Sequence, residues 1–141
     1  MSVEKNKANL RRFSEEILDK GNVAILSELI ATDFVLHTTP LVQEIKGLEG
    51  YRQFVIGTRA VFPDLKSRID KMVAEGDMVA GRFTVTGTHK GELMGIAPTG
   101  KKFTTQNAVF ARFEGVKIVE VWEYYDSLPY YRQLGIPLPA Q

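Results

Sequence analysis

Apolar residues recur at helical spacing over the first part of the chain. Between Glu4 and Lys20 they fall at every third or fourth position, with charged residues between them. Gly21 provides the usual stop just past a helix end, and Asn22 is a good cap for a second short helix that continues to Ile30. The pattern therefore predicts a helical hairpin at the start of the chain.

The next segment combines a short strand with a third helix. Residues 33–39 alternate in strand fashion, and Pro40 ends the strand. Apolar positions at a period of 3.6 residues then predict a helix over residues 48–62. Pro63 closes this helix because the residue before a proline is displaced from helical backbone angles.

Beyond Pro63 the pattern changes to strands rich in Val, Thr, Phe and Tyr. Short turns at Gly76 and Gly115 join neighbouring strands, so these neighbours are antiparallel. A loop over residues 91–100 separates the second strand from the third, and a last short helix covers 128–134. The predicted strands are 65–74, 78–89, 103–113 and 116–125.

This order of elements predicts the fold class. Helices first and antiparallel strands afterwards indicate an α+β fold, in which a curved antiparallel sheet wraps around the N-terminal helices. Such a sheet forms a cone with an apolar interior, and concavities of this kind bind small molecules. We find no repeat, low-complexity segment or linker, so residues 1–141 are expected to form a single domain.

Composition narrows the partners and the chemistry. The 18 Lys and Arg residues nearly balance the 17 Asp and Glu residues and form no basic stripe, so we expect no nucleic-acid partner. The absence of Cys excludes disulfides, cysteine-based zinc sites and thiol catalysis. No apolar run approaches the ~20 residues that span a bilayer, and the first residues lack the apolar segment of a signal peptide. We therefore expect a cytoplasmic protein without membrane contact.

The segment 119–126 carries the most candidate chemistry. Strand alternation places Glu120, Trp122, Tyr124 and Asp126 on one face. If that face lines the pocket, apolar walls raise the pKa of a carboxyl and prepare it to exchange protons near neutral pH. In the alternative interpretation, Glu120 and Asp126 lie at a wet rim and only solvate it.

Other polar residues are weaker candidates. His37 either projects into the pocket as an acid, base or hydrogen-bond donor, or is a structural side chain. Arg82 is either a pocket group paired with an acid or part of an outward polar face. Gln106 lies on the next strand, where polar packing is the default. No cluster has the spacing of metal ligands, and no serine-nucleophile or phosphate-loop motif is present, so we expect neither a metal nor a nucleotide cofactor.

These segments together resemble the SnoaL-like polyketide cyclases, also called ester cyclases, of the nuclear transport factor 2-like superfamily. The resemblance runs in family order along nearly the whole chain. The matching positions are 9–13, 21–22, 31–34, His37, 60–65, 87–93, 95–100, 117–122, Asp126 and 133–135.

The resemblance implies a cone-shaped cystatin-like roll that dimerises through its sheet. It also implies ring closure of a polyketide by intramolecular aldol condensation, without metal or organic cofactor. An aspartate on the last long strand is the acid/base in this family, and Asp126 resembles it. His37 resembles the histidine beside the pocket mouth. Glu123, Tyr124 and Tyr125 stand where many family members carry other residues, which leaves the substrate open.

The leading hypothesis is a cofactor-free cyclase-like enzyme acting on an apolar small molecule. Asp126 would move the proton, with His37 and either Glu120 or Tyr124 stabilising the enolate. An epoxide-hydrolase-like variant would instead use Asp126, Arg82 and Glu120. A third alternative is a binding module or dimeric adaptor without turnover. The residues expected to contact the substrate are Phe13, Phe54, Arg82, Gln106, Phe110, Trp122 and Tyr124.

Overall fold

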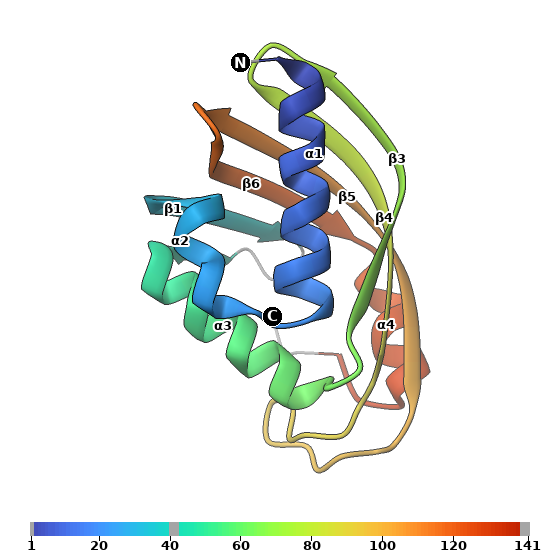
Figure 1. The fold of residues 1–141 in the computed structure, drawn as a ribbon. Helices are drawn as coiled ribbons and strands as arrows, with labels where there is room; N and C mark the ends of the chain where they lie inside the picture. The colour runs from blue at the N-terminus through green and yellow to red at the C-terminus, as the bar shows by residue number, and fades with distance from the viewer. Residues whose placement is uncertain (1, 40–42, 139–141) are drawn as a thin grey trace.

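A computed structural model describes residues 2–39 and 43–138, so the predicted strand end at Pro40 lies outside the described residues. Figure 1 shows α1 and α3 on the concave side of a curved sheet. The helices are α1 (Val3–Phe13), η1 (Ser14–Asp19), η2 (Val23–Ile25), α2 (Leu26–Leu29), α3 (Leu48–Val61) and α4 (Ser127–Leu134). The strands are β1 (Ile30–Thr39), β2 (Gln43–Lys46), β3 (Lys66–Glu75), β4 (Met78–Thr88), β5 (Lys102–Glu114) and β6 (Lys117–Tyr125).

The predicted helical hairpin is present at the start of the chain. Ser2 caps α1, because its hydroxyl accepts a hydrogen bond from the backbone N–H of Lys5 at 3.1 Å. The helix then widens into the π-helical turn η1 before it stops at Gly21, whose φ of +67° only glycine adopts without strain. The two short helices η2 and α2 follow, and they lead directly into β1.

The six strands form one mixed, mostly antiparallel sheet in the order β2-β1-β6-β5-β4-β3. The predicted α+β class and the antiparallel pairing of β3 through β6 are confirmed. Two features were not predicted from the sequence. The short strand β2 pairs with β1, and β1 runs parallel to β6. Parallel strands cannot be joined by a tight turn, so the whole chain between them makes the crossover.

A β-bulge interrupts the pairing of β5 with β6. Near the hairpin turn, Phe113 of β5 pairs with Ile118 of β6. The residue before it, Arg112, pairs with Glu120 and not with Val119. Val119 is therefore the extra residue on β6. One extra residue reverses which side of the sheet every later residue of a strand faces.

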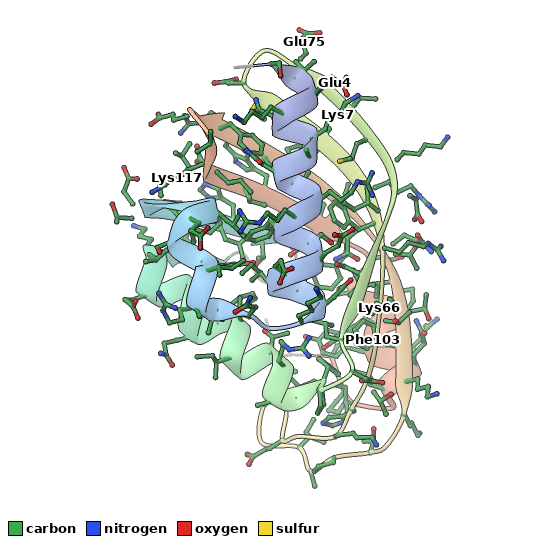
Figure 2. The ribbon with its side chains drawn as sticks, in the orientation of Figure 1. Glu4, Lys7, Lys66, Glu75, Phe103 and Lys117 are labelled. Atoms are coloured by element: carbon green, nitrogen blue, oxygen red, sulfur yellow. The ribbon has the colours of Figure 1, made fainter. Side chains whose placement is uncertain are left out.

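The core lies between the helices and the concave face of the sheet. It includes Leu10 and Phe13 of α1 and Val55 of α3, packed against inward residues of the strands. Phe103 of β5 is buried, whereas Figure 2 shows the charged side chain of Glu75, at the end of β3, at the outer edge of the molecule. Within the described ranges, none of the helices is long and apolar enough to cross a membrane.

Candidate functional site

A cavity of about 200 Å³ lies between the helices and the concave face of the sheet. Its walls are mainly aromatic and aliphatic, and they come from α1, η1, α3, α4 and the strands β1, β3, β4, β5 and β6. Phe13 and Phe54, both predicted to contact the substrate, are part of these walls. A chamber of this composition favours an apolar ligand with a few polar groups.

The prediction that the even-numbered residues of β6 face the cavity is wrong. Val121, Glu123 and Tyr125 line the cavity, so Glu120, Trp122 and Tyr124 project from the opposite, convex face of the sheet. The bulge at Val119 is the cause. A regular ladder from the turn through Phe113 and Ile118 would have turned the even-numbered residues inward.

Glu123 is the only carboxylate among the described residues that line this cavity. Its Oε2 accepts a hydrogen bond from Nδ2 of Asn107 on β5 at 3.0 Å. Burial raises the pKa of the Glu123 carboxyl above its ordinary value, and the bond from Asn107 opposes this shift only in part. A carboxyl in this position can hold or release a proton closer to neutral pH than a surface glutamate can.

A neighbouring threonine orients the Asn107 amide. The Thr105 hydroxyl donates to Oδ1 of Asn107 at 2.8 Å, and the amide Nδ2 is thereby directed at Glu123. Both residues are buried, and both belong to the cavity wall. The chain thus holds the carboxylate through two consecutive inward residues of β5.

Two tyrosines, Tyr51 and Tyr125, line the same cavity as this carboxylate. Burial, together with the nearby Tyr131 and Glu123, raises the pKa of Tyr125 to about 12. Burial and the charge of Glu123 also raise the pKa of Tyr51, which lines the cavity from α3. Both hydroxyls therefore stay protonated at neutral pH and can only donate or accept hydrogen bonds there.

His37 and Glu120 form a different cluster on the convex face. Nε2 of His37 lies 2.6 Å from Oε2 of Glu120, and Nη2 of Arg112 donates to Oε1 of the same carboxylate at 3.2 Å. The His37 ring stacks on Trp122, with the ring centroids 5.4 Å apart. The bond with His37, and secondarily the bonds from Arg112, lower the pKa of Glu120. This cluster shares no residue with the cavity.

Asp126 lies at the N-terminus of α4. Its carboxylate accepts a hydrogen bond from the backbone N–H of Leu128 at 3.2 Å, which is the geometry of a helix N-cap. Asp126 does not line the cavity. The structure therefore gives this residue a structural contact in place of the expected position beside the substrate.

The remaining predicted contact residues also lie on the convex face. Arg82 pairs with Asp70, with Nη1 and Oδ2 2.9 Å apart. Gln106 accepts a hydrogen bond from Thr84, and Phe110 packs edge-on against Tyr124. The three residues proposed for an epoxide-hydrolase-like site thus have separate partners and form no common site: Asp126, Arg82 and Glu120.

Sequence reasoning missed Glu123 and Asn107. A signal for Asn107 was present in β5, because it lies in the same two-residue period as the apolar Val109, Ala111 and Phe113 and so belongs to their face. No comparable signal identifies Glu123, because its direction depends on the bulge. Among the residues that the structure describes, no three His, Asp or Glu side chains gather as a metal site.

Comparison with known proteins agrees with this architecture. The family model described as SnoaL-like polyketide cyclase matches residues 8–134. The chain belongs to the SnoaL-like polyketide cyclase family. The family assignment expected from the sequence motifs is confirmed.

Named relatives and solved structures of this family cover nearly the whole chain. The aklanonic acid methyl ester cyclase AcmA of Streptomyces galilaeus is 28% identical over 134 residues, which are 94% of this chain and 92% of AcmA. The crystal structure of IdmH from Streptomyces antibioticus is 30% identical, with a TM-score of 0.81 over 93% of this chain and 99% of IdmH.

A more distant structure supports the fold alone. A protein from Catenulispora acidiphila with a ketosteroid isomerase-like fold is 20% identical and has a TM-score of 0.77 over 92% of this chain and 93% of its own. The SnoaL-like chain therefore has the ketosteroid isomerase-like, nuclear transport factor 2-like fold that its sequence predicted.

Proposed function

We propose that this chain is a cofactor-independent, polyketide-cyclase-like enzyme in which Glu123 moves a proton between carbon and oxygen centres of an apolar small molecule. The observation that carries the proposal is the position of Glu123, a carboxylate of raised pKa in the wall of an apolar cavity. Asn107 keeps the carboxylate oriented through the 3.0 Å hydrogen bond. The relatives named as ester cyclases support the choice of reaction.

The proposed step is an intramolecular aldol addition. The Glu123 carboxylate removes a proton from the carbon beside a substrate carbonyl, and an enolate forms. The enolate carbon attacks a second carbonyl of the same molecule, so a carbon–carbon bond forms and the oxygen of that carbonyl becomes an alkoxide. The alkoxide takes the proton back from Glu123. The product is an isomer of the substrate, and the carboxylate is regenerated.

The first test measures proton abstraction without assuming the natural substrate. The probe is 2-tetralone, a bicyclic ketone, and the readout is replacement of its α-hydrogens by deuterium in D₂O, followed by NMR. We expect exchange above the buffer rate with the unmodified protein. The Glu123→Gln variant should reduce that exchange by roughly a hundredfold or more, because the amide cannot accept the proton.

Glu120→Gln is the matched control. It removes a carboxylate from the same strand but from the convex face, so exchange should remain within about twofold of the unmodified protein. Equal exchange by the Glu123→Gln variant and the unmodified protein would reject the proposal.

The second test uses the substrate class in the names of the relatives. The protein is incubated with aklanonic acid methyl ester, and chromatography with mass spectrometry detects a product of unchanged mass and altered retention. Binding of this ester without conversion, together with no exchange of 2-tetralone, would favour a ligand carrier over an enzyme.

We also propose that the protein is a homodimer and that the convex face of the sheet is its interface. Phe110 and Tyr124 lie side by side on this face and are 42% and 45% exposed. Trp122 lies on the same face and is partly exposed. Aromatic side chains are enriched at the centres of protein interfaces, and a second copy would cover all three. The family resemblance implies the same mode of assembly.

A further inference from the structure

Tyr51 carries a polar group in the cavity wall that the proposed proton transfer does not use. Three aromatic rings hold its side chain on α3. The Tyr51 ring centroid lies 5.9 Å from that of Phe13, 4.9 Å from that of Phe34 and 5.9 Å from that of Phe54. The residue is 4% exposed. Its hydroxyl is therefore carried by a packed ring on a regular helix, which fixes the position of the donor before any ligand binds.

The Tyr51 hydroxyl has no hydrogen-bond partner among the residues that the structure describes. It is not among the buried polar atoms that are sealed off from solvent without a partner. Because Tyr51 lines the cavity, its free hydroxyl reaches the open space there. A hydroxyl that is open to the cavity and has no protein partner can donate its hydrogen bond to a polar group of a ligand there.

The negative charge that moves in the proposed step indicates which group of the substrate the Tyr51 hydroxyl would bind. Glu123 comes from β6 and Tyr51 from α3, and both side chains line the same cavity of about 200 Å³. When the carboxylate takes a proton from carbon, negative charge moves from Glu123 to the substrate oxygen. A fixed, neutral hydroxyl in an apolar chamber stabilises that new charge strongly, because little water competes for it.

We propose that the Tyr51 hydroxyl donates a hydrogen bond to the oxygen of the enolate that Glu123 generates. The inference rests on the proposed function and adds to it the group that binds the oxyanion. Tyr51 keeps its proton throughout, and Glu123 alone carries the transferred proton. Asn107 donates one of its two amide N–H groups to Glu123 and holds the base in place, whereas the Tyr51 hydroxyl bonds no residue that the structure describes.

The test measures oxyanion binding without turnover. In the Glu123→Gln background the carboxylate charge is gone, and 4-nitrophenolate serves as an analogue of the enolate. Its affinity is compared, at a pH where the phenol is ionised, with that of 4-nitrotoluene, which has a similar shape but no oxyanion. We expect the phenolate to bind more tightly, and Tyr51→Phe to weaken its binding by roughly ten- to hundredfold with little effect on 4-nitrotoluene.

Tyr131→Phe is the matched control, because Tyr131 is a buried tyrosine that does not line the cavity. It should leave the affinities for both probes within about twofold. Three outcomes would overturn the inference. They are equal affinity of the Glu123→Gln protein for the two probes, unchanged phenolate affinity when Tyr51→Phe is added, or equal losses of affinity for both probes in that double variant. The last outcome would assign Tyr51 to packing alone.

Exchange of 2-tetralone separates this inference from the proposed function. If Glu123→Gln abolishes exchange and Tyr51→Phe lowers kcat with little change in KM, both stand. If Glu123→Gln abolishes exchange but Tyr51→Phe has no effect on exchange or phenolate binding, only the role of Tyr51 fails. If Glu123→Gln exchanges normally, the proposed function fails, whatever the phenolate affinities are.

Discussion

Two glutamates on β6, three residues apart, have opposite electrostatic surroundings. Glu120 on the convex face is bonded by His37 and Arg112, and its pKa is lowered. Glu123 faces the cavity, where burial raises its pKa. The direction in which a strand residue points thus decides whether the same carboxyl is a fixed anion or a group prepared for proton transfer.

The Glu123→Gln variant should gain stability relative to the unmodified protein as the pH rises above about 4.5, the ordinary value for glutamate. A raised pKa means that the folded state holds the proton more tightly than the unfolded state does. Ionisation above 4.5 therefore weakens the unmodified protein until the folded pKa is passed, whereas the amide does not ionise. Urea unfolding between pH 4 and pH 8 measures the difference, and parallel curves for the two proteins would contradict it.

The Glu120→Gln variant should show the opposite dependence. A lowered pKa means that the ionised carboxylate stabilises the folded state, and this stabilisation is present above about 4.5 and lost as the pH falls through the folded pKa. Because the cluster with His37 is partly exposed, we expect a loss of about 1 kcal/mol at neutral pH that shrinks in acid. Acid unfolding followed by circular dichroism tests this, and a loss that grows on acidification would disprove it.

Among the elements, the bulge in β6 does most to position the site. Without Val119 as an extra residue, the ladder from Phe113 and Ile118 would place the next acidic residue, Glu120, inward. The local sequence around Val119 contains neither glycine nor proline, the residues that usually mark an irregularity in a strand. The helices, the strands other than β2 and the antiparallel pairing of β3 through β6 followed from periodicity and turns, but the inward face of β6 did not.

The parallel pairing of β1 with β6 was unpredictable for a related reason. The two strands are about eighty residues apart in the chain, and their contact depends on the whole sheet having formed. The short strand β2 has only four residues, too few for a clear alternation. Of the predicted site residues, Phe13 and Phe54 lie in the cavity wall because helical periodicity alone turned them inward.

Asp126→Ala should lower the free energy of unfolding by about 1 kcal/mol, because α4 loses the side chain that caps its N-terminus. Asp126→Asn should be nearly neutral, since asparagine is an equally good cap. Exchange of 2-tetralone should be within about twofold of the unmodified protein in both variants. Thermal unfolding and the exchange assay check these expectations. Loss of exchange in Asp126→Asn at unchanged stability would restore the catalytic role expected from the family resemblance.

At the scale of the whole molecule, the sheet separates two surfaces with different tasks. The concave face encloses the cavity, and the convex face carries exposed aromatic residues and paired charges. The α+β fold and its apolar interior were predictable from the order and periodicity of the elements. Which residues lie on which surface was not, because the assignment depends on pairing between distant strands.

The double variant Phe110→Lys, Tyr124→Lys should be monomeric at concentrations where the unmodified protein is a dimer. Lysine would bring like charges together at the centre of the proposed interface. Sedimentation velocity measures the assembly, and the 2-tetralone assay shows whether the cavity still works in the monomer. An unchanged sedimentation coefficient would place the dimer contact elsewhere, and a monomeric unmodified protein would remove the proposed dimer.

The central claim is that the bulge turns Glu123 into an apolar cavity, where its carboxyl binds a proton more tightly than an ordinary glutamate. A ¹³C NMR titration of the glutamate side-chain carboxyls tests this directly, with the Glu123→Gln and Glu120→Gln variants assigning the two resonances. We expect the Glu123 resonance to titrate above 4.5 and the Glu120 resonance to titrate below it. A Glu123 midpoint at or below 4.5 would contradict the account.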